Sequence, residues 1–274
     1  MVFFRDKTAV VTGAGSGLGR AIARALAREG ADVHIVDVNR ERIREVENEL
    51  RAAGAPIEAH VTNVADPDAM MRLADRVFES RGRVDLLFNN AGVCAGGPVE
   101  SLRLEDWRWS IDVNLYGVIH GLMAFVPRMI GQGGKSVIVN TASMAGLVGF
   151  PYMAPYSASK FAVVGLGESL ASELAPHGIH VLTVCPGAVA TNVIRDGRIA
   201  LPGDYLGRVE RFFNRQAADP DRTASRILKA VRRRKTLLVM SGSFWPLYVI
   251  KRISSSLYVA VFRILTGRVA KNTR

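Results

Sequence analysis

The segment "YSASK", residues 156–160, places Tyr156 four residues before Lys160. Residues at this spacing share one face of a helix. A free phenol titrates near pH ~10 and is a poor base at neutral pH, but a nearby ammonium stabilises the phenolate and lowers that pKa. The pair could therefore transfer protons. The same spacing also occurs in one turn of an ordinary exposed helix, so the surrounding residues must decide.

A glycine-rich stretch near the N-terminus could hold a phosphate group. "TGAGSGLG", residues 12–19, follows a β-branched run and opens a helix-like segment. Glycine permits positive φ and a close approach of the backbone to a ligand, and free N–H groups at a helix start favour an anion. A tight turn without a ligand is the alternative, but this position favours a dinucleotide pyrophosphate. The residues expected to contact it are Gly13, Ser16, Gly17, Leu18 and Gly19.

Asp37 ends the second strand-like run, roughly twenty residues past the glycine stretch. An acid at this place accepts hydrogen bonds from the adenosine ribose hydroxyls and repels a 2′-phosphate, which favours NAD over NADP. Asp37 could instead be an acid that stabilises the N-terminus of the helix from Arg40. Arg40 is itself a nearby cation and leaves NADP open.

Six motifs in order resemble those of the short-chain dehydrogenases/reductases. They are "TGAGSGLG", "NNAG" (89–92), Asn114, Ser143, "YSASK" and "PGAVAT" (186–191), and the resemblance covers about residues 5–195. It implies a Rossmann-type domain, a nicotinamide cofactor and an active site of Asn114, Ser143, Tyr156 and Lys160.

The resemblance gives each of these four residues a role. Tyr156 would be the general acid/base, and Lys160 would lower its pKa and hold the nicotinamide ribose. Ser143 would hydrogen-bond the substrate oxygen, and Asn114 would hold a water that passes protons to Lys160. By residue type alone, Ser143 could be a cap or turn residue and Asn114 a solvated or capping residue.

The resemblance also extends the set of cofactor contacts. "NNAG" should let backbone lie against the adenine-ribose side, and Pro186-Gly187 should lie beside the nicotinamide. Asn63 departs from the acidic residue that the family more often carries, although its carbonyl oxygen can still bond the adenine amino group. The further expected contacts are Asn63, Val64, Asn90, Ala91, Gly92, Tyr156, Lys160, Pro186, Gly187, Val189 and Thr191.

The elements that must position these residues alternate between strand and helix patterns. Strands are predicted over 8–13, 32–38, 57–64, 84–92, 136–143 and 179–187, and helices over 20–29, 40–53, 67–80, 106–130 and 156–175. This alternation predicts an α/β fold with a doubly wound parallel sheet. Ligands of such sheets bind outside the carboxyl ends of the strands, where the motifs fall.

Charge divides the chain unevenly. Of the 36 Lys and Arg residues, thirteen lie in 222–274, and that segment holds none of the 25 Asp and Glu residues. We therefore predict one catalytic domain over 1–221, with a substrate lid at about 190–220, and a basic C-terminal extension over 222–274. The body is slightly acidic, so the high pI of the chain does not indicate that the body binds nucleic acid, and we expect no nucleic-acid partner.

The two cysteines, Cys94 and Cys185, form neither a disulfide framework nor a metal set. We interpret them as small buried hydrophobes and expect no metal site. Their scarcity favours a reducing compartment, and the N-terminus lacks the apolar core of a signal peptide. Both observations predict a cytoplasmic protein.

Apolar residues in the stretch 144–155, including Met144, Leu147, Phe150 and Met153, predict a hydrophobic pocket. They could equally pack on a helix or a subunit. The expected function is hydride transfer between a nicotinamide cofactor and a hydrophobic secondary alcohol or ketone, steroid-, retinoid- or lipid-like. The alternative is a catalytically idle cofactor-binding scaffold that its basic tail recruits to membranes. The resemblance also implies a homodimer or homotetramer, formed through the helices that carry Asn114 and Tyr156.

Residues 245–265 have helical periodicity without the length of apolar sequence that a membrane span needs. Ile250, Ile253, Leu257, Val261 and Ile264 fall on one side of this helix, and Arg252, Ser255, Ser256 and Arg263 fall on the other. With the upstream run 232–235, the pattern is typical of a helix lying in an anionic membrane surface. A helix packed on the body or on a sister subunit is the alternative.

Overall fold

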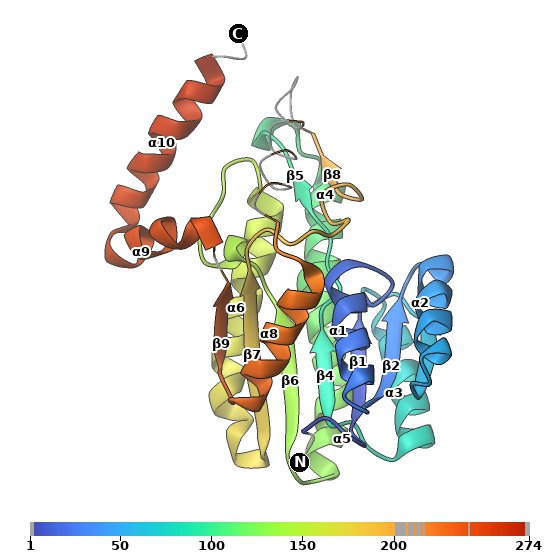
Figure 1. The fold of residues 1–274 in the computed structure, drawn as a ribbon. Helices are drawn as coiled ribbons and strands as arrows, with labels where there is room; N and C mark the ends of the chain where they lie inside the picture. Colours follow the sequence, from blue (N-terminus) through green and yellow to red (C-terminus); the bar gives the residue numbers. More distant parts are fainter. Residues whose placement is uncertain are drawn as a thin grey trace.

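The computed structural model describes residues 3–200, 207, 211, 215, 217–240 and 242–271, and within them seven parallel strands form one sheet (Figure 1). The strands are β1 (Thr8–Thr12), β2 (Asp32–Asp37), β3 (Ile57–Val61), β4 (Leu86–Asn89), β6 (Ser136–Thr141), β7 (Ile179–Pro186) and β9 (Leu237–Met240). Their order across the sheet is β3-β2-β1-β4-β6-β7-β9. The predicted doubly wound parallel sheet is confirmed, and the order reverses between β1 and β4.

Helices cover both faces of the sheet (Figure 1). One layer holds α1 (Gly17–Arg28), α2 (Arg40–Ala52) and α8 (Pro220–Arg232), and the other holds α3 (Pro67–Arg81), α4 (Leu104–Ile111), α5 (Gly117–Gly131) and α6 (Ala154–Glu173). Because side chains alternate across a strand, Val11 packs in the first layer and Val10 in the second. The strands can therefore be apolar almost throughout.

The sheet continues past the domain boundary predicted at residue 222. β9 pairs with β7 from Thr183↔Leu237 to Pro186↔Met240, and the buried face of α8 packs with α1 in the first layer. The prediction is corrected here, because the basic residues of α8 lie on its outer face while Ile227, Leu228 and Val231 are buried. The extension that leaves the sheet begins at about Gly242.

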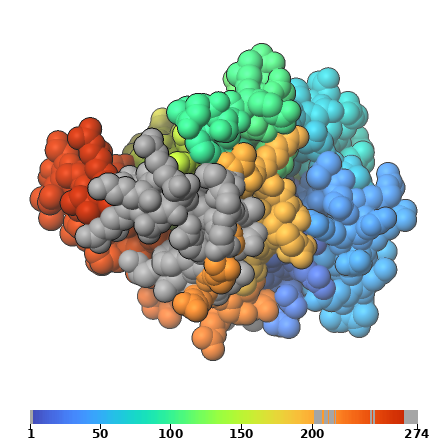
Figure 2. All heavy atoms as spheres, turned by 90° about the horizontal axis from the view of Figure 1, so that it is seen from above, coloured from blue at the N-terminus to red at the C-terminus, as the bar shows by residue number. Residues whose placement is uncertain are grey.

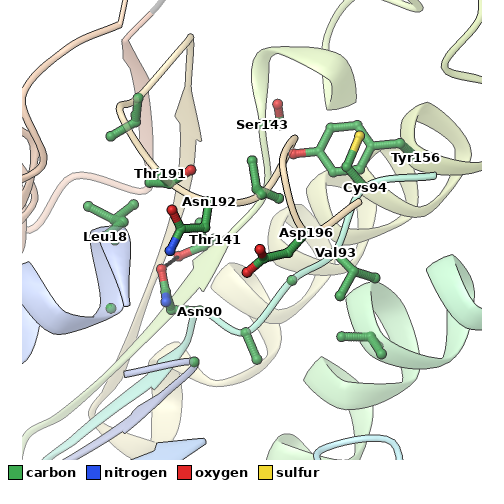
Figure 3. Close-up of a pocket in the computed structure, with 18 of the residues that line it drawn as sticks. Leu18, Asn90, Val93, Cys94, Thr141, Ser143, Tyr156, Thr191, Asn192 and Asp196 are labelled. Carbon is green, nitrogen blue, oxygen red and sulfur yellow. Dashed lines mark hydrogen bonds between the residues drawn. The ribbon is translucent and has the colours of Figure 1, made fainter. Parts of the chain in front are cut away.

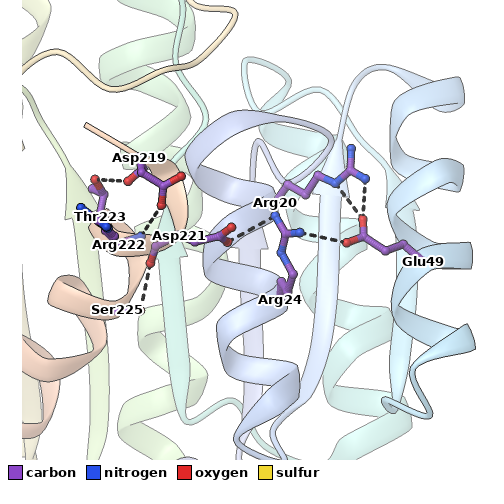
Figure 4. A network of polar contacts seen from close by, with 8 residues as sticks. All are labelled: Arg20, Arg24, Glu49, Asp219, Asp221, Arg222, Thr223 and Ser225. Atoms are coloured by element: carbon purple, nitrogen blue, oxygen red, sulfur yellow. Dashed lines mark hydrogen bonds and ion pairs between the residues drawn. The ribbon is translucent and has the colours of Figure 1, made fainter. Parts of the chain in front are cut away.

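Ion pairs reinforce this junction of α1, α2 and α8 (Figure 4). Arg24 lies between Glu49 of α2 and Asp221 of α8, with nitrogen–oxygen distances of 3.3 Å to each, and Arg20 lies 2.6 Å from Glu49. Asp219 caps α8 by accepting a hydrogen bond from the Arg222 N–H. The start of α8 is thus held against the glycine-loop helix.

The C-terminal segment forms two helices instead of the single helix that the periodicity predicts. After a short turn (η5, Gly242–Phe244), α9 (Trp245–Ile253) ends where Ser254 is extended, and α10 (Ser255–Lys271) projects from one side of the molecule (Figures 1 and 2). The basic run 232–235 lies at the amino end of β9, whereas α9 follows its carboxyl end. The two features therefore do not form one surface.

A cluster of apolar residues joins η5, α9 and α10, which together we call the tail, to the body of the molecule. Phe244 and Tyr258 are buried against Met144 and Val148, and we call this group with its surrounding residues the tail cluster. Lys251 donates a hydrogen bond to the Leu147 carbonyl at 2.7 Å. The tail thus packs directly on the loop that follows β6.

Thirteen of the 31 residues of the predicted lid over 190–220 fall outside the described residues. Its described start forms β8 (Arg198–Ile199), which pairs with β5 (Ala95–Gly96) in a small parallel sheet. The Arg198 guanidinium lies 4.4 Å from the ring centroid of Trp109. These contacts fix the path of the chain after β7.

One helical run among the described residues, Leu104–Gly131, is long and apolar enough to cross a membrane by length and composition. It consists of α4, a π-helical turn (η2, Asp112–Tyr116) and α5, and it packs against α3 and α6. Internal helices of a sheet protein pass the same test, so this property does not identify a span.

The revised boundary predicts how shortened chains behave. A chain ending at Asp221 loses α8 and β9 and uncovers β7 and α1, so it should not unfold cooperatively. Burial of each large side chain contributes about 1.5–3 kcal/mol, and four such losses rival a typical total stability of about 5–15 kcal/mol. A chain ending at Met240 keeps the sheet and should unfold cooperatively. Circular dichroism with thermal unfolding distinguishes them, and cooperative unfolding of both would restore the boundary at 222.

Candidate active site

A cleft of about 1050 Å³ opens at the carboxyl ends of the strands. Such an edge, beside the point where the strand order reverses, is where doubly wound sheets bind ligands. Every residue that the sequence predicted for catalysis or cofactor contact lines this cleft, with the exception of Asn114. The motifs that lie far apart in the sequence are therefore brought together.

The glycine loop forms one wall of the cleft. Gly13 has φ +66° and Gly17 has φ +52°, and a Cβ on Gly17 would lie 2.8 Å from Thr191 Cγ2. Ser16 begins α1 without a side-chain cap, and the described first turn of α1 contains no acid. The first N–H groups of α1 and its positive dipole end are thus available to an anion, which fits a dinucleotide pyrophosphate.

Asp37 lies at the end of β2 and contacts the glycine loop. Its carboxylate accepts a hydrogen bond from the Gly15 N–H and another from the Asn39 N–H, both at 2.9 Å. Asn39, not Asp37, caps α2 by accepting from the Arg42 N–H. Asp37 therefore supports the loop and still borders the cleft, where its remaining lone pairs can meet ribose hydroxyls.

The cation at this end of the cleft is Arg42 and not Arg40. Arg42 lines the cleft, and its Nη1 lies 2.6 Å from Asp196 Oδ2 in the segment after β7. Periodicity explains the difference, because Arg40 is the first residue of α2 and Arg42 lies further round the first turn. The pair Arg42–Asp196 links two elements that border the cleft, and neither residue belongs to a motif in the sequence.

Asn90 of "NNAG" joins the ends of three strands. Its Nδ2 donates to the Thr12 carbonyl at 3.0 Å, and its Oδ1 accepts from the Thr141 hydroxyl at 3.3 Å. The Thr12 hydroxyl in turn accepts from the backbone N–H groups of Asn90 and Ala91. Thr12, the first residue of the glycine motif, and Thr141 of β6 are positioning residues for which the sequence predicted no role.

Asn63 and Val64 line the far end of the cleft after β3. The Asn63 side-chain oxygen, Oδ1, accepts a hydrogen bond from the Ala65 backbone N–H at 3.0 Å. This bond orients the amide and leaves the oxygen a second lone pair. The Val64 carbonyl accepts from His120 Nδ1 at 2.9 Å, which anchors the same turn on α5.

Tyr156 lies near the start of α6 with its hydroxyl directed at Ser143, and Cys94 lies beside its ring (Figure 3). Burial raises the pKa of Tyr156 above its ordinary value, and Cys94 adds to the effect, while the hydrogen bond with Ser143 opposes it. The expected lowering by Lys160 does not offset this burial. Tyr156 is therefore a neutral phenol, the form that donates a proton.

Lys160 lies at the end of β6, one helical turn after Tyr156. Its Nζ donates to the Thr141 carbonyl at 2.9 Å and lies 5.8 Å from the centroid of the Tyr156 ring. The side chain is buried, and burial lowers the pKa of Lys160 to about 8. The ammonium is thus held at the end of β6 beside Gly92, and its remaining donors can meet a ribose.

Asn114 lies in the π-helical turn, behind the cleft. Its Oδ1 accepts from the Val93 N–H at 2.8 Å, and its Nδ2 donates to the Val93 carbonyl and to the Ser159 hydroxyl. The side chain therefore fixes the segment after "NNAG" against α6. π-Helical turns occur often at functional sites, and the water relay proposed for Asn114 stays a prediction.

The segment after β7 closes the opposite wall. The Gly187 N–H donates to the Met240 carbonyl at 2.7 Å, and Val189 bridges to Ala218. Pro186, Gly187, Val189 and Thr191 all line the cleft. β9 is what holds this segment, so a strand outside the recognised motifs helps to shape the site.

Cys94 and Cys185 are buried close to Tyr156 and Lys160. Burial raises the pKa of each thiol to about 12, so both stay protonated. This agrees with the interpretation of both as small hydrophobic residues.

The predicted apolar wall is present in part. Met144, Phe150 and Met153 line the cleft, while Leu147 packs in the tail cluster. Phe244 of the tail also lines the cleft, and its ring meets Phe150 edge-on with centroids 5.1 Å apart. The tail therefore contributes to this wall.

These features define the class of protein. A doubly wound parallel sheet carries a glycine loop and a paired tyrosine and lysine around one cleft, which is the arrangement of a nicotinamide-dependent oxidoreductase. The chain belongs to the short-chain dehydrogenase family, whose sequence profile, described as "short chain dehydrogenase", matches residues 7–199.

Known proteins of this family resemble the chain over most of its length. It is 34% identical to a putative oxidoreductase SadH of Mycobacterium tuberculosis, over 99% of this chain and 98% of the relative. It is 39% identical to a cyclohexanol dehydrogenase of Acinetobacter sp., over 70% of this chain and 77% of the relative. The chain spans 44% of the length of other curated relatives that it matches, the mycobacterial proteins named probable oxidoreductase EphD.

A solved structure agrees with the fold. A short-chain dehydrogenase/reductase from Burkholderia phymatum in complex with NAD superposes with a TM-score of 0.87 at 35% identity, covering 94% of this chain and 96% of that one.

Proposed function

We propose that this oxidoreductase interconverts a hydrophobic secondary alcohol and its ketone with NAD. The observation that carries the proposal is the position of the Tyr156 hydroxyl and Ser143 in a cleft partly walled by Met144, Phe150, Met153 and Phe244. Apolar walls with a few convergent polar groups bind apolar ligands in a fixed orientation. The name of the Acinetobacter relative, a cyclohexanol dehydrogenase, supports an alcohol of this kind.

Under this proposal each polar group of the site has a task. The bound nicotinamide would supply or accept the hydride. Ser143 would hydrogen-bond the substrate oxygen, and Tyr156 would donate its proton to a carbonyl oxygen in reduction or recover it in oxidation. Lys160 would hold the ribose and supply positive charge whenever the phenol ionises.

NAD is the proposed cofactor because the acid at the end of β2 remains at the cleft. Asp37 would meet the ribose hydroxyls and repel a 2′-phosphate. Arg42 is the cation that could receive such a phosphate, but it is paired with Asp196. A 2′-phosphate would then share the Arg42 guanidinium with the Asp196 carboxylate, which would repel it.

The proposal that the tail lies in an anionic membrane surface rests on its exposed side chains. Ile253 is 79% exposed, Leu257 53% and Ile264 60%, while Tyr258 points into the tail cluster. No acidic residue follows Asp221 in the sequence. Because the tail cluster includes the loop beside the substrate wall, a lipid-soluble substrate would reach the cleft next to the membrane.

Association into a homodimer or homotetramer through α5 and α6 is a further proposal. Met123 on α5 is 61% exposed and Phe161 on α6 is 37% exposed. Exposed apolar side chains of this size suit a helix-to-helix contact between copies of the chain.

Replacing Tyr156 tests the proposed reaction. A panel of hydrophobic secondary alcohols and ketones, followed by cofactor absorbance, should reveal turnover by the unmodified enzyme. Tyr156→Phe deletes the titrating oxygen, so turnover should fall by about 10²-fold or more while cofactor affinity stays similar. Tyr116→Phe, on the exposed side of the π-helical turn, should behave normally. Turnover by Tyr156→Phe at the normal rate would refute this mechanism, and a panel without any turnover would favour the idle scaffold.

Cofactor preference tests the role of Asp37. Calorimetric titration should show tighter binding of NAD than of NADP. Asp37→Ala should narrow this preference, because the repulsion of a 2′-phosphate is removed. Asp37→Asn removes the negative charge but keeps support for the glycine loop, because the amide oxygen can still accept a hydrogen bond from the Gly15 N–H. Asp68→Ala removes an exposed carboxylate in the first turn of α3, away from the cleft, and should leave the cofactor preference unchanged. Tighter binding of NADP by the unmodified protein would show that Arg42 dominates instead.

Vesicle co-sedimentation tests the tail. The full chain should bind anionic vesicles, and the chain ending at Met240 should not. The double variant Ile253→Asp/Leu257→Asp should also lose binding, whereas Val99→Asp, at another exposed apolar position, should keep it. Binding should weaken with salt, since charges are screened over about 10 Å at ~0.1 M. Equal sedimentation of full and shortened chains would assign the tail to packing alone.

A further inference from the structure

Two histidines and a glutamate meet at the edge of the sheet that is remote from the tail. His34 lies on β2, and Glu58 and His60 lie on β3, the outermost strand. His34 and Glu58 are register partners, and His60 follows Glu58 by two residues, so all three point to the same face. That face is the one covered by α3, because Val36, two residues after His34, packs in the second layer.

The three side chains converge to within ligand distance of one point. His34 Nδ1 lies 3.0 Å from His60 Nε2, and each of these nitrogens lies 3.7 Å from an oxygen of Glu58. Zinc binds histidine nitrogen and carboxylate oxygen at about 2.0–2.2 Å in a tetrahedron, in which neighbouring ligand atoms are roughly 3.3–3.5 Å apart. The two 3.7 Å distances run to different oxygens of Glu58, and one ligand atom from each residue lies within 4.8 Å of the others. Side-chain adjustments of about an ångström would therefore bring the three ligand atoms to this spacing around one ion.

Burial gives the site one closed side and one open side. His34 is fully buried and His60 is 6% exposed, while the Glu58 side chain is 42% exposed. Burial lowers the pKa of each histidine to about 4, so both rings are neutral, which is the form that binds metal. The fourth position of a tetrahedron would lie toward Glu58, where solvent reaches.

Two arginines lie near the histidine cluster, and a carboxylate neutralises one of them. Arg81 and Arg76 of α3 disfavour a cation near His34 and His60 respectively. Asp32, two residues before His34 on the same face, lies 2.8 Å from the Arg81 guanidinium and neutralises it. The other oxygen of Asp32, Oδ1, is buried without a hydrogen-bond partner among the described residues. This carboxylate oxygen can therefore still accept a hydrogen bond near the cluster.

The geometry points to a divalent-cation site of the zinc type, formed by His34, Glu58 and His60, that clamps β3 to β2. None of the three lines the cleft, so among the described residues the site is separate from the candidate active site. The turn after β3 carries Asn63 and Val64, which border the adenine end of the cleft. An ion here would therefore hold the edge strand that positions those residues.

The test uses the full chain freed of metal with a chelator and dialysed. Zn²⁺ should bind with one ion per chain by elemental analysis. A saturating excess of about 100-fold over Kd should raise the unfolding temperature by about 5 °C or more. Co²⁺ should give the visible absorption of a tetrahedral ion with nitrogen and oxygen ligands, and Zn²⁺ should displace it.

Variants identify the ligands. His60→Gln and Glu58→Gln should each lose Co²⁺ absorption and the thermal shift. Glu58 is half-exposed, so its variant should fold even if the buried histidine variant does not. His177→Gln removes an exposed histidine elsewhere and should bind like the unmodified chain. No uptake by the unmodified protein, or equal uptake by Glu58→Gln, would overturn the proposal and leave the two rings as a hydrogen-bonded neutral pair.

Discussion

The hydrogen bond from the buried Lys160 ammonium to the Thr141 carbonyl organises the candidate active site. A buried cation is costly unless it is hydrogen-bonded, so this acceptor has to be present when α6 packs on the sheet. Thr141 is in turn bonded to Asn90, and Asn90 to Thr12. One chain of polar contacts therefore runs from α6 through the ends of β6, β4 and β1.

This polar chain sets where the chemistry can take place. The Lys160 ammonium is bonded to the end of β6, and burial dominates the raised pKa of Tyr156. Tyr156 consequently keeps its proton in this structure, and its hydroxyl meets Ser143. Asn114 acts from behind, where its amide fixes the Val93 backbone against Ser159 of α6. The site is therefore built as much by residues behind the cleft as by residues in it.

The C-terminal segment has two separate relations to this site. α8 and β9 complete the sheet, and β9 holds the wall after β7 through the Gly187 N–H. α9 and α10 pack on the loop after β6 through Phe244 and Tyr258 and bring Phe244 to the cleft. Movement of the tail would therefore shift Phe244 in the proposed substrate wall. This contact connects the proposed membrane surface to the proposed hydrophobic substrate.

Local patterns in the sequence were sufficient for six of the seven strands of the sheet and for the helices between them, and they brought the predicted site residues to one cleft. Alternating strand and helix segments predict the doubly wound sheet, and in such a sheet all carboxyl ends meet at one edge, so Gly13, Asp37, Gly92, Ser143 and Thr191 had to converge. Their convergence follows from topology and needs no knowledge of side-chain contacts.

Other features depend on which side chain meets which neighbour, and only the tertiary structure decided them. The pKa of Tyr156 depends on burial and on where Lys160 finds its acceptor. The basic composition of 222–274 hid a strand and a helix, because net charge does not show which face of α8 is apolar. Arg42 and Asp196 lie 154 positions apart, and His34 meets Glu58 and His60 only through the register of β2 with β3. Pairings of this kind have no local signature, since they arise when segments distant in sequence are packed side by side.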